Sequence, residues 1–220
     1  MSHPFPLLYC LFALAACSAQ SASDRTTLSD DFDREMPFAY GMPGLLFPVD
    51  TSPAYGKAGI PLNITGTVFR ADGKTPAPGI IIYYYHTDTT GRYATRPGEA
   101  RNMPQNRLGQ THGYLRGWVR SGADGSYRIH TILPGAYPGR DEPRHIHLSV
   151  EDPVVPQPYY IDDIVFDHDP LLTPARRSGF DLRGGSGLVA LARINGELTG
   201  TRDVYLGANI PDYPDAKGGN

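Results

Sequence analysis

Two histidines separated by one residue stand out in the segment YPGRDEPRHIHLSV, which runs from Tyr137 to Val150. Successive side chains of a strand point to opposite faces, so His145 and His147 would share one face while Ile146 points into a core. Two imidazoles on a rigid strand make half of a metal site. The same short pattern also recurs by chance, and the alternative is that both histidines face solvent.

A tyrosine precedes the first of these histidines and extends the candidate site. An oxidised iron favours oxygen donors, and a bound cation lowers the pKa of its ligand, so a phenol can bind as phenolate near neutral pH. Tyr137 lies in the turn sequence PGAYPG just before the predicted strand, from which it could fold back onto the same centre. The chain holds 14 tyrosines, and their spacing alone does not choose among them.

The elements that must position these residues are predicted to be short strands. With 25 glycines and 21 prolines in 220 residues, the composition favours strands joined by tight turns over long helices. Alternating or β-prone runs recur along the chain: LNITGTVF, IIIYYYHT, YLRGWVR, SYRIHTIL, RHIHLSVE, YYIDDIVF, GLVALARI and ELTGTRDVYLG. No helical period is evident. The predicted fold is therefore all-β, a single antiparallel β-sandwich with long loops carrying the metal site.

Two pairs of these runs have the signature of hairpins. YLRGWVR and SYRIHTIL are joined by the glycine-containing loop SGADG, and the last two runs are joined by Asn195-Gly196. We expect each pair to form neighbouring antiparallel strands.

The N-terminal residues predict export. The apolar run from Leu7 to Ala16 is too short to span a bilayer and is typical of a secretory signal. Leu14-Ala15-Ala16-Cys17 resembles the bacterial lipobox, in which the cysteine is lipidated. No Lys or Arg precedes the run, and an ordinary cleaved signal is the alternative. The expected location is the periplasm or the outer membrane, as a lipid-anchored protein.

This interpretation divides the chain into three parts. Residues 1–16 are the predicted signal peptide, residues 17–50 the lipidated cysteine with a tether that wraps the domain, and residues 51–220 one β-sandwich domain. The two cysteines, Cys10 and Cys17, both lie in the N-terminal part, so no thiol is left for a disulfide or a metal in the domain. A metal there must be held by His, Tyr, Asp or Glu.

The charge balance argues against a nucleic-acid partner. The chain has 20 Lys and Arg against 23 Asp and Glu, and no run of basic residues could follow a phosphate backbone. The oligomeric state stays open, because the residues before Asp50 show no helical period of the kind a dimerisation helix would need.

Four sequence blocks together resemble the intradiol ring-cleavage dioxygenases, the non-haem Fe(III) enzymes that open catechols. The blocks are YYYHTDTTGRY, GWVRSGADGSYRIHTILPGAYPGR, HIHLSV and DIVFDHDPLL, in that order and at similar intervals over roughly residues 60 to 172. The resemblance implies an iron held by four ligands: Tyr93, Tyr137, His145 and His147.

The resemblance also implies an activity. A small aromatic diol would bind the iron through both oxygens, Tyr137 would leave the metal and accept a proton, and O2 would open the ring to a muconate-type dicarboxylic acid. Tyr137 would therefore be both a metal ligand and a catalytic residue.

Two positions depart from the pattern of that family. Glu142 stands where relatives usually have an arginine that stabilises the negatively charged ring, and Asp163 stands where a glutamine is frequent. Arg140 and Arg144 flank Glu142, and Arg140 is the predicted substitute catalytic residue because it directly follows the YPG turn. Both departures place a carboxylate near the expected anion and bear on the substrate more than on iron binding.

Other histidines have simpler interpretations. His86 follows a buried-looking strand and is expected to be a hydrogen-bonded structural residue, whereas His112 lies in a loop that could border the substrate pocket.

Three hypotheses follow from the sequence. The leading one is an exported, membrane-tethered Fe(III) dioxygenase acting on a catechol. The alternatives are a lipid-anchored β-sandwich that binds a catechol-containing ligand or iron chelate without turnover, and a structural sandwich in which the His-x-His pattern is incidental.

Overall fold

The computed structural model describes residues 28, 31–32 and 37–214. The predicted signal peptide, the lipobox with Cys17 and most of the predicted tether lie outside these described residues. Among the residues described, no helix is long and apolar enough to cross a membrane.

Strands dominate this part of the chain, and the helix whose bounds lie within the described residues is short. In chain order the elements are β1 (Val49–Thr51), β2 (Pro61–Phe69), β3 (Ile81–Tyr85), β4 (Arg116–Arg120), β5 (Ser126–Ile132), β6 (His145–Glu151), β7 (Tyr159–Phe166), α2 (Pro174–Ser178), β8 (Leu188–Val189), β9 (Ala192–Ile194), β10 (Glu197–Thr201) and β11 (Val204–Tyr205). The helix is a single capped turn, with the Thr173 hydroxyl accepting the Arg176 N–H, and is too short to produce a helical period in the sequence.

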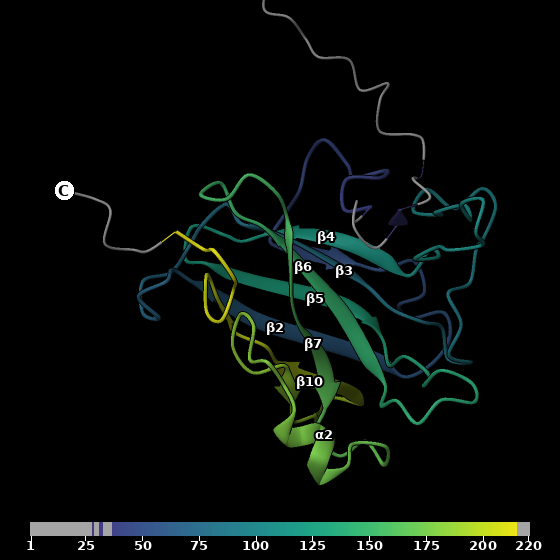
Figure 1. Cartoon of the computed structure of the whole chain (residues 1–220). Coiled ribbons are helices and arrows are strands. Elements are labelled where there is room, and N and C mark those ends of the chain that lie inside the picture. The colour runs from purple at the N-terminus through teal and green to yellow at the C-terminus, as the bar shows by residue number, and fades with distance from the viewer. Residues whose placement is uncertain (1–27, 29–30, 33–36, 215–220) are drawn as a thin grey trace, which may run out of the picture.

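The strands form two sheets that face each other (Figure 1). The first has the order β1-β5-β2-β10-β9, with β11 beside β2, and the second has the order β4-β3-β6-β7-β8. The predicted all-β sandwich is confirmed. Its pairing is mixed, however, because β1 with β5, β10 and β11 with β2, and β8 with β7 run parallel. The other pairs are antiparallel, as expected.

One predicted hairpin is wrong and the other is confirmed. β4 pairs with β3 in the second sheet, whereas β5 pairs with β2 in the first, so the SGADG loop crosses between the sheets. Ser121 anchors this crossing, because its hydroxyl donates to the Ala77 carbonyl and accepts the Ile80 N–H. β9 and β10 form the second hairpin, with Asn195 and Gly196 at positive φ in its turn.

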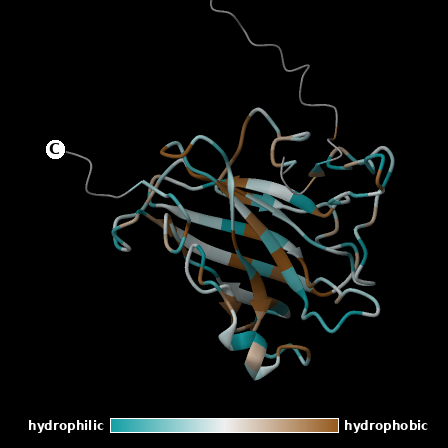
Figure 2. Ribbon diagram, viewed as in Figure 1, coloured by the Kyte–Doolittle hydropathy of each residue, from teal (hydrophilic) through white to brown (hydrophobic). Residues whose placement is uncertain are grey.

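The main core lies between the sheets and follows the alternation of the strands. Ile146, Leu148 and Val150 of β6 are fully buried there, together with residues of β2, β3 and β5. Figure 2 shows hydrophobic and hydrophilic positions alternating along the strands. The outward positions of β6, which include both histidines, face the opposite side of the second sheet.

That opposite side is also covered, so the second sheet is buried on both faces. Tyr83 and Tyr85 of β3 pack there with Trp118 of β4 and with Phe38 from the segment before β1. The Trp118 indole N–H donates to the Phe38 carbonyl at 2.7 Å, which fixes this segment over the sheet. Residues 37–48 therefore lie against the second sheet and continue directly into β1.

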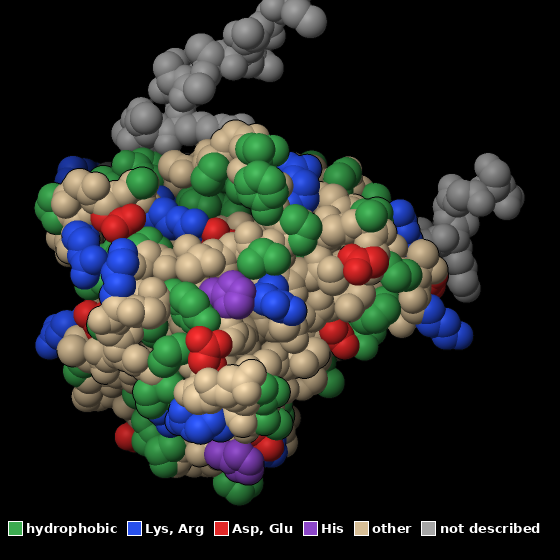
Figure 3. Space-filling model, turned by 180° about the vertical axis from the view of Figure 1, so that it is seen from behind, with side chains coloured by type: hydrophobic (Ala, Val, Ile, Leu, Met, Phe, Trp, Pro, Cys, Tyr) green, Lys and Arg blue, Asp and Glu red, His purple; other side chains and the backbone are tan. Residues whose placement is uncertain are grey.

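Charges of both signs are interspersed on the surface in the view of Figure 3. No field of a single sign dominates that face.

Candidate metal centre

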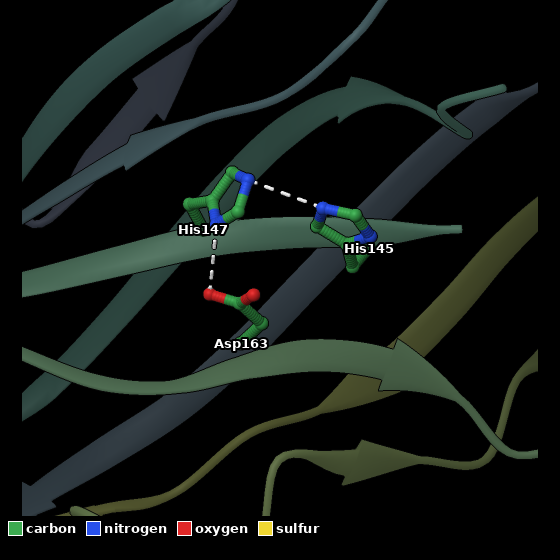
Figure 4. A group of neighbouring side chains, drawn as sticks. All are labelled: His145, His147 and Asp163. Carbon is green, nitrogen blue, oxygen red and sulfur yellow. Dashed lines mark hydrogen bonds and ion pairs between the residues drawn. The ribbon is translucent and has the colours of Figure 1, made fainter. Parts of the chain in front are cut away.

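Strand β6 presents both histidines to the outer face of the second sheet. His145 and His147 alternate with the core residues Ile146 and Leu148, as the His-x-His pattern predicts. The two Nε2 atoms lie 3.1 Å apart, and Figure 4 shows the rings converging from neighbouring outward positions.

Two tyrosine hydroxyls complete a compact group of four donor atoms. His147 Nε2 lies 2.9 Å from the Tyr93 hydroxyl and 3.1 Å from the Tyr137 hydroxyl. His145 Nε2 lies 3.2 Å from the Tyr137 hydroxyl, and the two hydroxyls are in hydrogen-bond contact with each other. The structure thus brings together all four residues that the family resemblance implied as metal ligands.

The loops that carry the tyrosines are held together at a glycine. Gly91 has a φ of 77°, and a Cβ added to it would lie 1.8 Å from the carbonyl oxygen of Ala136. The backbone two residues before Tyr93 therefore packs directly on the backbone one residue before Tyr137. Only glycine permits this approach, so the contact allows the two tyrosine-bearing loops to pack closely together.

The second ring nitrogen of each histidine, Nδ1, contacts its own hydrogen-bond acceptor. His145 Nδ1 lies 2.7 Å from the Pro143 carbonyl oxygen, and His147 Nδ1 lies 3.0 Å from Asp163 Oδ1. A proton on Nδ1 satisfies each contact, which leaves both Nε2 lone pairs directed at the tyrosine hydroxyls.

The donor set fits a transition metal. A first-row metal bonded at about 2.0–2.3 Å to each donor brings neighbouring donors roughly 3 Å apart, which matches the contacts above. Two phenol oxygens with two imidazole nitrogens suit an oxidised iron. Burial raises the pKa values of Tyr93 and Tyr137 and lowers that of His145, so a cation is required before both phenols can act as phenolates.

Stacked aromatic rings pack against one member of this group of four donors. Tyr85 stacks on His147 with ring centroids 4.5 Å apart, and His112 stacks on the other side of Tyr85 at 3.4 Å. His112 Nδ1 lies 2.8 Å from the Tyr83 hydroxyl, and burial lowers the pKa of His112 well below its usual value. This stack limits the movement of the His147 ring, a role that the sequence pattern did not indicate for Tyr85.

A cavity of about 1000 Å³ opens over three of the four donor residues, whereas His145 lines the neighbouring, smaller cavity. Tyr93, Tyr137 and His147 line the larger cavity, together with Arg92 and Arg140. His112 also lines this cavity, as expected from its loop, although it is mostly buried in the ring stack.

The flanking arginines have different positions. The Arg140 guanidinium lies 5.4 Å from the centre of the Tyr137 ring, and its side chain is 70% exposed. Arg144 instead donates to the buried carboxylate of Asp169 at 2.6 Å. Glu142 lines a second cavity of about 450 Å³, on the side of His145 and Asp163. Arg140 is therefore the arginine of this loop that borders the cavity over the donors.

His86 has the structural position expected for it. It is 1% exposed, and its Nε2 lies 2.7 Å from the hydroxyl of Thr131 on β5. This contact joins the end of β3 to the opposite sheet.

The structure is that of a β-sandwich protein in which two tyrosine hydroxyls and two histidine nitrogens converge. A dioxygenase family model (Dioxygenase_C) matches residues 49–178, more than half of the chain. The chain belongs to this family, and the resemblance to intradiol ring-cleavage dioxygenases is confirmed.

Several known proteins are similar to this chain. Catechol 1,2-dioxygenase 1 of Acinetobacter lwoffii is 35% identical over 77 residues, which is 35% of this chain and 22% of that protein. The dioxygenase domain of a dioxygenase carbohydrate-binding protein fusion from Streptomyces sp. SirexAA-E is 28% identical with a TM-score of 0.51, over 75% of this chain and 94% of that one. The 3-chlorocatechol 1,2-dioxygenase of Rhodococcus opacus 1CP has a TM-score of 0.54 at 17% identity, over 74% of this chain and 66% of that one, and supports the fold alone.

Proposed function

We propose that this protein cleaves a catechol-type aromatic diol with O2 at a non-haem Fe(III) held by Tyr93, Tyr137, His145 and His147. The product would be a muconate-type dicarboxylic acid. The observation that carries the proposal is the convergence of these four donors, two from loops and two from β6, at the floor of a cavity that Tyr93, Tyr137 and His147 line. Membership of the dioxygenase family supports it.

The chain's own groups have separate tasks in this reaction. Bound Fe(III) would supply Lewis acidity that prepares the diol for reaction with O2. The Tyr137 hydroxyl borders the cavity and would hold the proton taken from a substrate hydroxyl. Arg140, beside the Tyr137 ring, would stabilise the negative charge that the substrate gains. The Tyr85 and His112 rings would keep His147 in place.

The cavity has room for more than a single ring. A buried pocket of about 150 Å³ accommodates benzene, whereas this cavity has a volume of about 1000 Å³. Catechols with ring substituents therefore belong among the proposed substrates. Measuring kcat/KM for a panel of substituted catechols would rank them.

The test of this function is spectroscopic and chemical. The purified protein should bind iron and show the visible colour of a tyrosinate-to-Fe(III) charge-transfer band. Addition of a simple catechol should consume O2 and form a muconate, detected by its ultraviolet absorption. A colourless protein that takes up no iron would refute the proposal.

Two tyrosine variants sharpen the test. Tyr93→Phe should lose most of the band and of the bound iron, because it removes one of the two phenol donors. Tyr55→Phe is the control, since Tyr55 donates to Glu197 at 2.6 Å and does not border the donors. Equal loss of colour in both variants would contradict the assignment of Tyr93.

A binding function without turnover is the second candidate. The position of Glu142, where relatives place an arginine, favours it. Iron uptake and colour without O2 consumption, over a panel of catechols, would support this candidate over the enzyme.

The location is likewise a proposal, supported by the N-terminal sequence alone. We propose that the domain is exported and tethered through lipidated Cys17. Metabolic labelling with a radioactive or clickable fatty acid should mark the wild-type protein in a bacterial host and leave Cys17→Ser unlabelled. Labelling of both proteins would refute the assignment.

A further inference from the structure

The two candidate histidine ligands differ in what holds their outer nitrogen. His145 Nδ1 contacts a neutral carbonyl oxygen, that of Pro143, whereas His147 Nδ1 contacts the carboxylate of Asp163 (Figure 4). A carboxylate partner makes an imidazole a stronger donor at its other nitrogen than a carbonyl partner does. The structure therefore makes His147 and His145 electronically unequal.

An irregularity in the sheet aims Asp163 at His147. The pairing of β6 with β7 shifts by one residue between Ile146 and Leu148. As a result, Asp162 and Asp163 both lie opposite His147, where a regular ladder has a single residue. The Asp163 side chain turns to His147, whereas the Asp162 carboxylate accepts the backbone N–H groups of the 182–183 turn.

The Asp163 carboxylate is directed at His147. Within the part of the chain that the structure describes, His147 is the only side chain that a hydrogen bond or ion pair joins to its carboxylate. The side chain is 33% exposed and lines the smaller cavity, on the far side of the histidines from Arg140. Arg176 and Arg183 line the same cavity, but among the described residues the ion-pair partner of this carboxylate is His147.

The position of Asp163 argues for a supporting role over direct ligation. His145, His147 and Asp163 together could form a group of metal ligands, because one donor atom from each lies within 4.8 Å of the others. However, Asp163 contacts Nδ1 of His147, and the two tyrosine hydroxyls gather at Nε2 of the same ring. A metal among the tyrosine hydroxyls would therefore have the imidazole between itself and Asp163.

We propose that Asp163 is a positioning residue that keeps the His147 proton on Nδ1 and makes His147 the stronger of the two histidine donors to the iron. This inference rests on the metal centre of the proposed function. Because greater electron donation stabilises Fe(III) over Fe(II), Asp163 would increase iron affinity and lower the reduction potential of the site.

Asp163→Asn is the main test, since the amide oxygen can still accept from Nδ1 while the negative charge is lost. We expect about 10- to 100-fold weaker iron binding, measured by competition with a chelator. The midpoint potential should shift to a higher value, and the tyrosinate-to-iron band should move to longer wavelength, because the iron becomes more electron-poor. Asp163→Glu, which retains the carboxylate, should recover part of each change.

The adjacent acid provides a matched control. Asp162→Asn removes the same charge one residue away but leaves the contact with His147 intact. It should keep the affinity, the potential and the band of the wild-type protein.

The outcomes separate this inference from the function on which it rests. If Asp163→Asn matched the wild type in affinity, potential and band, or if Asp162→Asn shifted them equally, Asp163 would have no such role. Complete loss of iron in Asp163→Asn, with iron retained in Tyr137→Phe, would instead make Asp163 a direct ligand and overturn the inference. A wild-type protein without iron would refute the proposed function itself.

Discussion

At the scale of single residues, the charged side chains near the donors differ in whether they pair within the protein or face the cavity. The arginines that flank Glu142 look equivalent in sequence, but Arg144 is bound to buried Asp169 while Arg140 borders the cavity. Among the described residues the Arg140 guanidinium forms an ion pair with Glu142, at 4.0 Å on an exposed side chain, and such a contact is weak. Arg140 is therefore available to an anionic substrate.

Arg140→Gln should weaken the productive binding of a catechol without removing the iron. The expected change is about a fivefold rise in KM, or roughly 1 kcal/mol, because the lost charge is exposed to water. Steady-state O2 consumption measures it, and the iron content and visible band serve as internal checks. Arg128→Gln, an exposed arginine on β5, is the control; if it raised KM as much, the effect would be one of net charge.

At the scale of elements, the site depends on how two irregular loops pack on a regular strand. β6 orients the histidines by simple alternation, whereas Tyr93 and Tyr137 are brought together by the close backbone contact at Gly91. Their convergence is therefore sensitive to a single Cβ.

Gly91→Ala should separate the two tyrosines and reduce iron affinity. The new Cβ collides with the Ala136 carbonyl, and the positive φ adds strain, so a destabilisation of about 1–3 kcal/mol is expected as well. Gly98→Ala is a matched control, because Gly98 has a φ of 83° but a Cβ added to it would have no atom within 4 Å. Iron titration and thermal unfolding of both variants test the prediction, which fails if Gly91→Ala binds iron as Gly98→Ala does.

At the scale of the whole molecule, His86 links the two sheets through its contact with Thr131. The burial of this histidine also makes stability depend on pH. Burial lowers the pKa of His86 to about 4 from its usual 6.5. Between these values the unfolded chain takes up a proton that the folded protein does not, so stability falls as the pH decreases from about 6.5 to about 4. The loss is on the order of 3 kcal/mol.

His86→Gln should therefore reduce this pH dependence, to which buried His112 and His145 also contribute, while lowering stability at pH 7 by about 1–3 kcal/mol. Urea unfolding at several pH values between 4.5 and 7.5 measures both effects. His168→Gln, at an exposed histidine, should retain the wild-type slope; an unchanged slope in His86→Gln would exclude this origin.

Iron should stabilise the folded protein as a whole, because its donors come from β6 and from two distant loops. At iron concentrations about 100 times the Kd, the gain is about 2.7 kcal/mol, or roughly 5–10 °C in Tm. Calorimetry of the chelator-treated and iron-loaded protein tests this, and Tyr93→Phe should show a much smaller difference.

The sequence by itself determined the donor types, the shared face of His145 and His147, the short-strand architecture and the structural role of His86. These features follow from local rules, namely the two-residue period of a strand, the turn chemistry of glycine and proline, and a distinctive order of motifs. The tertiary structure decided the partners of β4 and β5, the choice between Arg140 and Arg144, and the contact of Asp163 with His147. Each of these depends on pairing between distant segments, and a register shift of one residue leaves no mark in the local pattern that would reveal it.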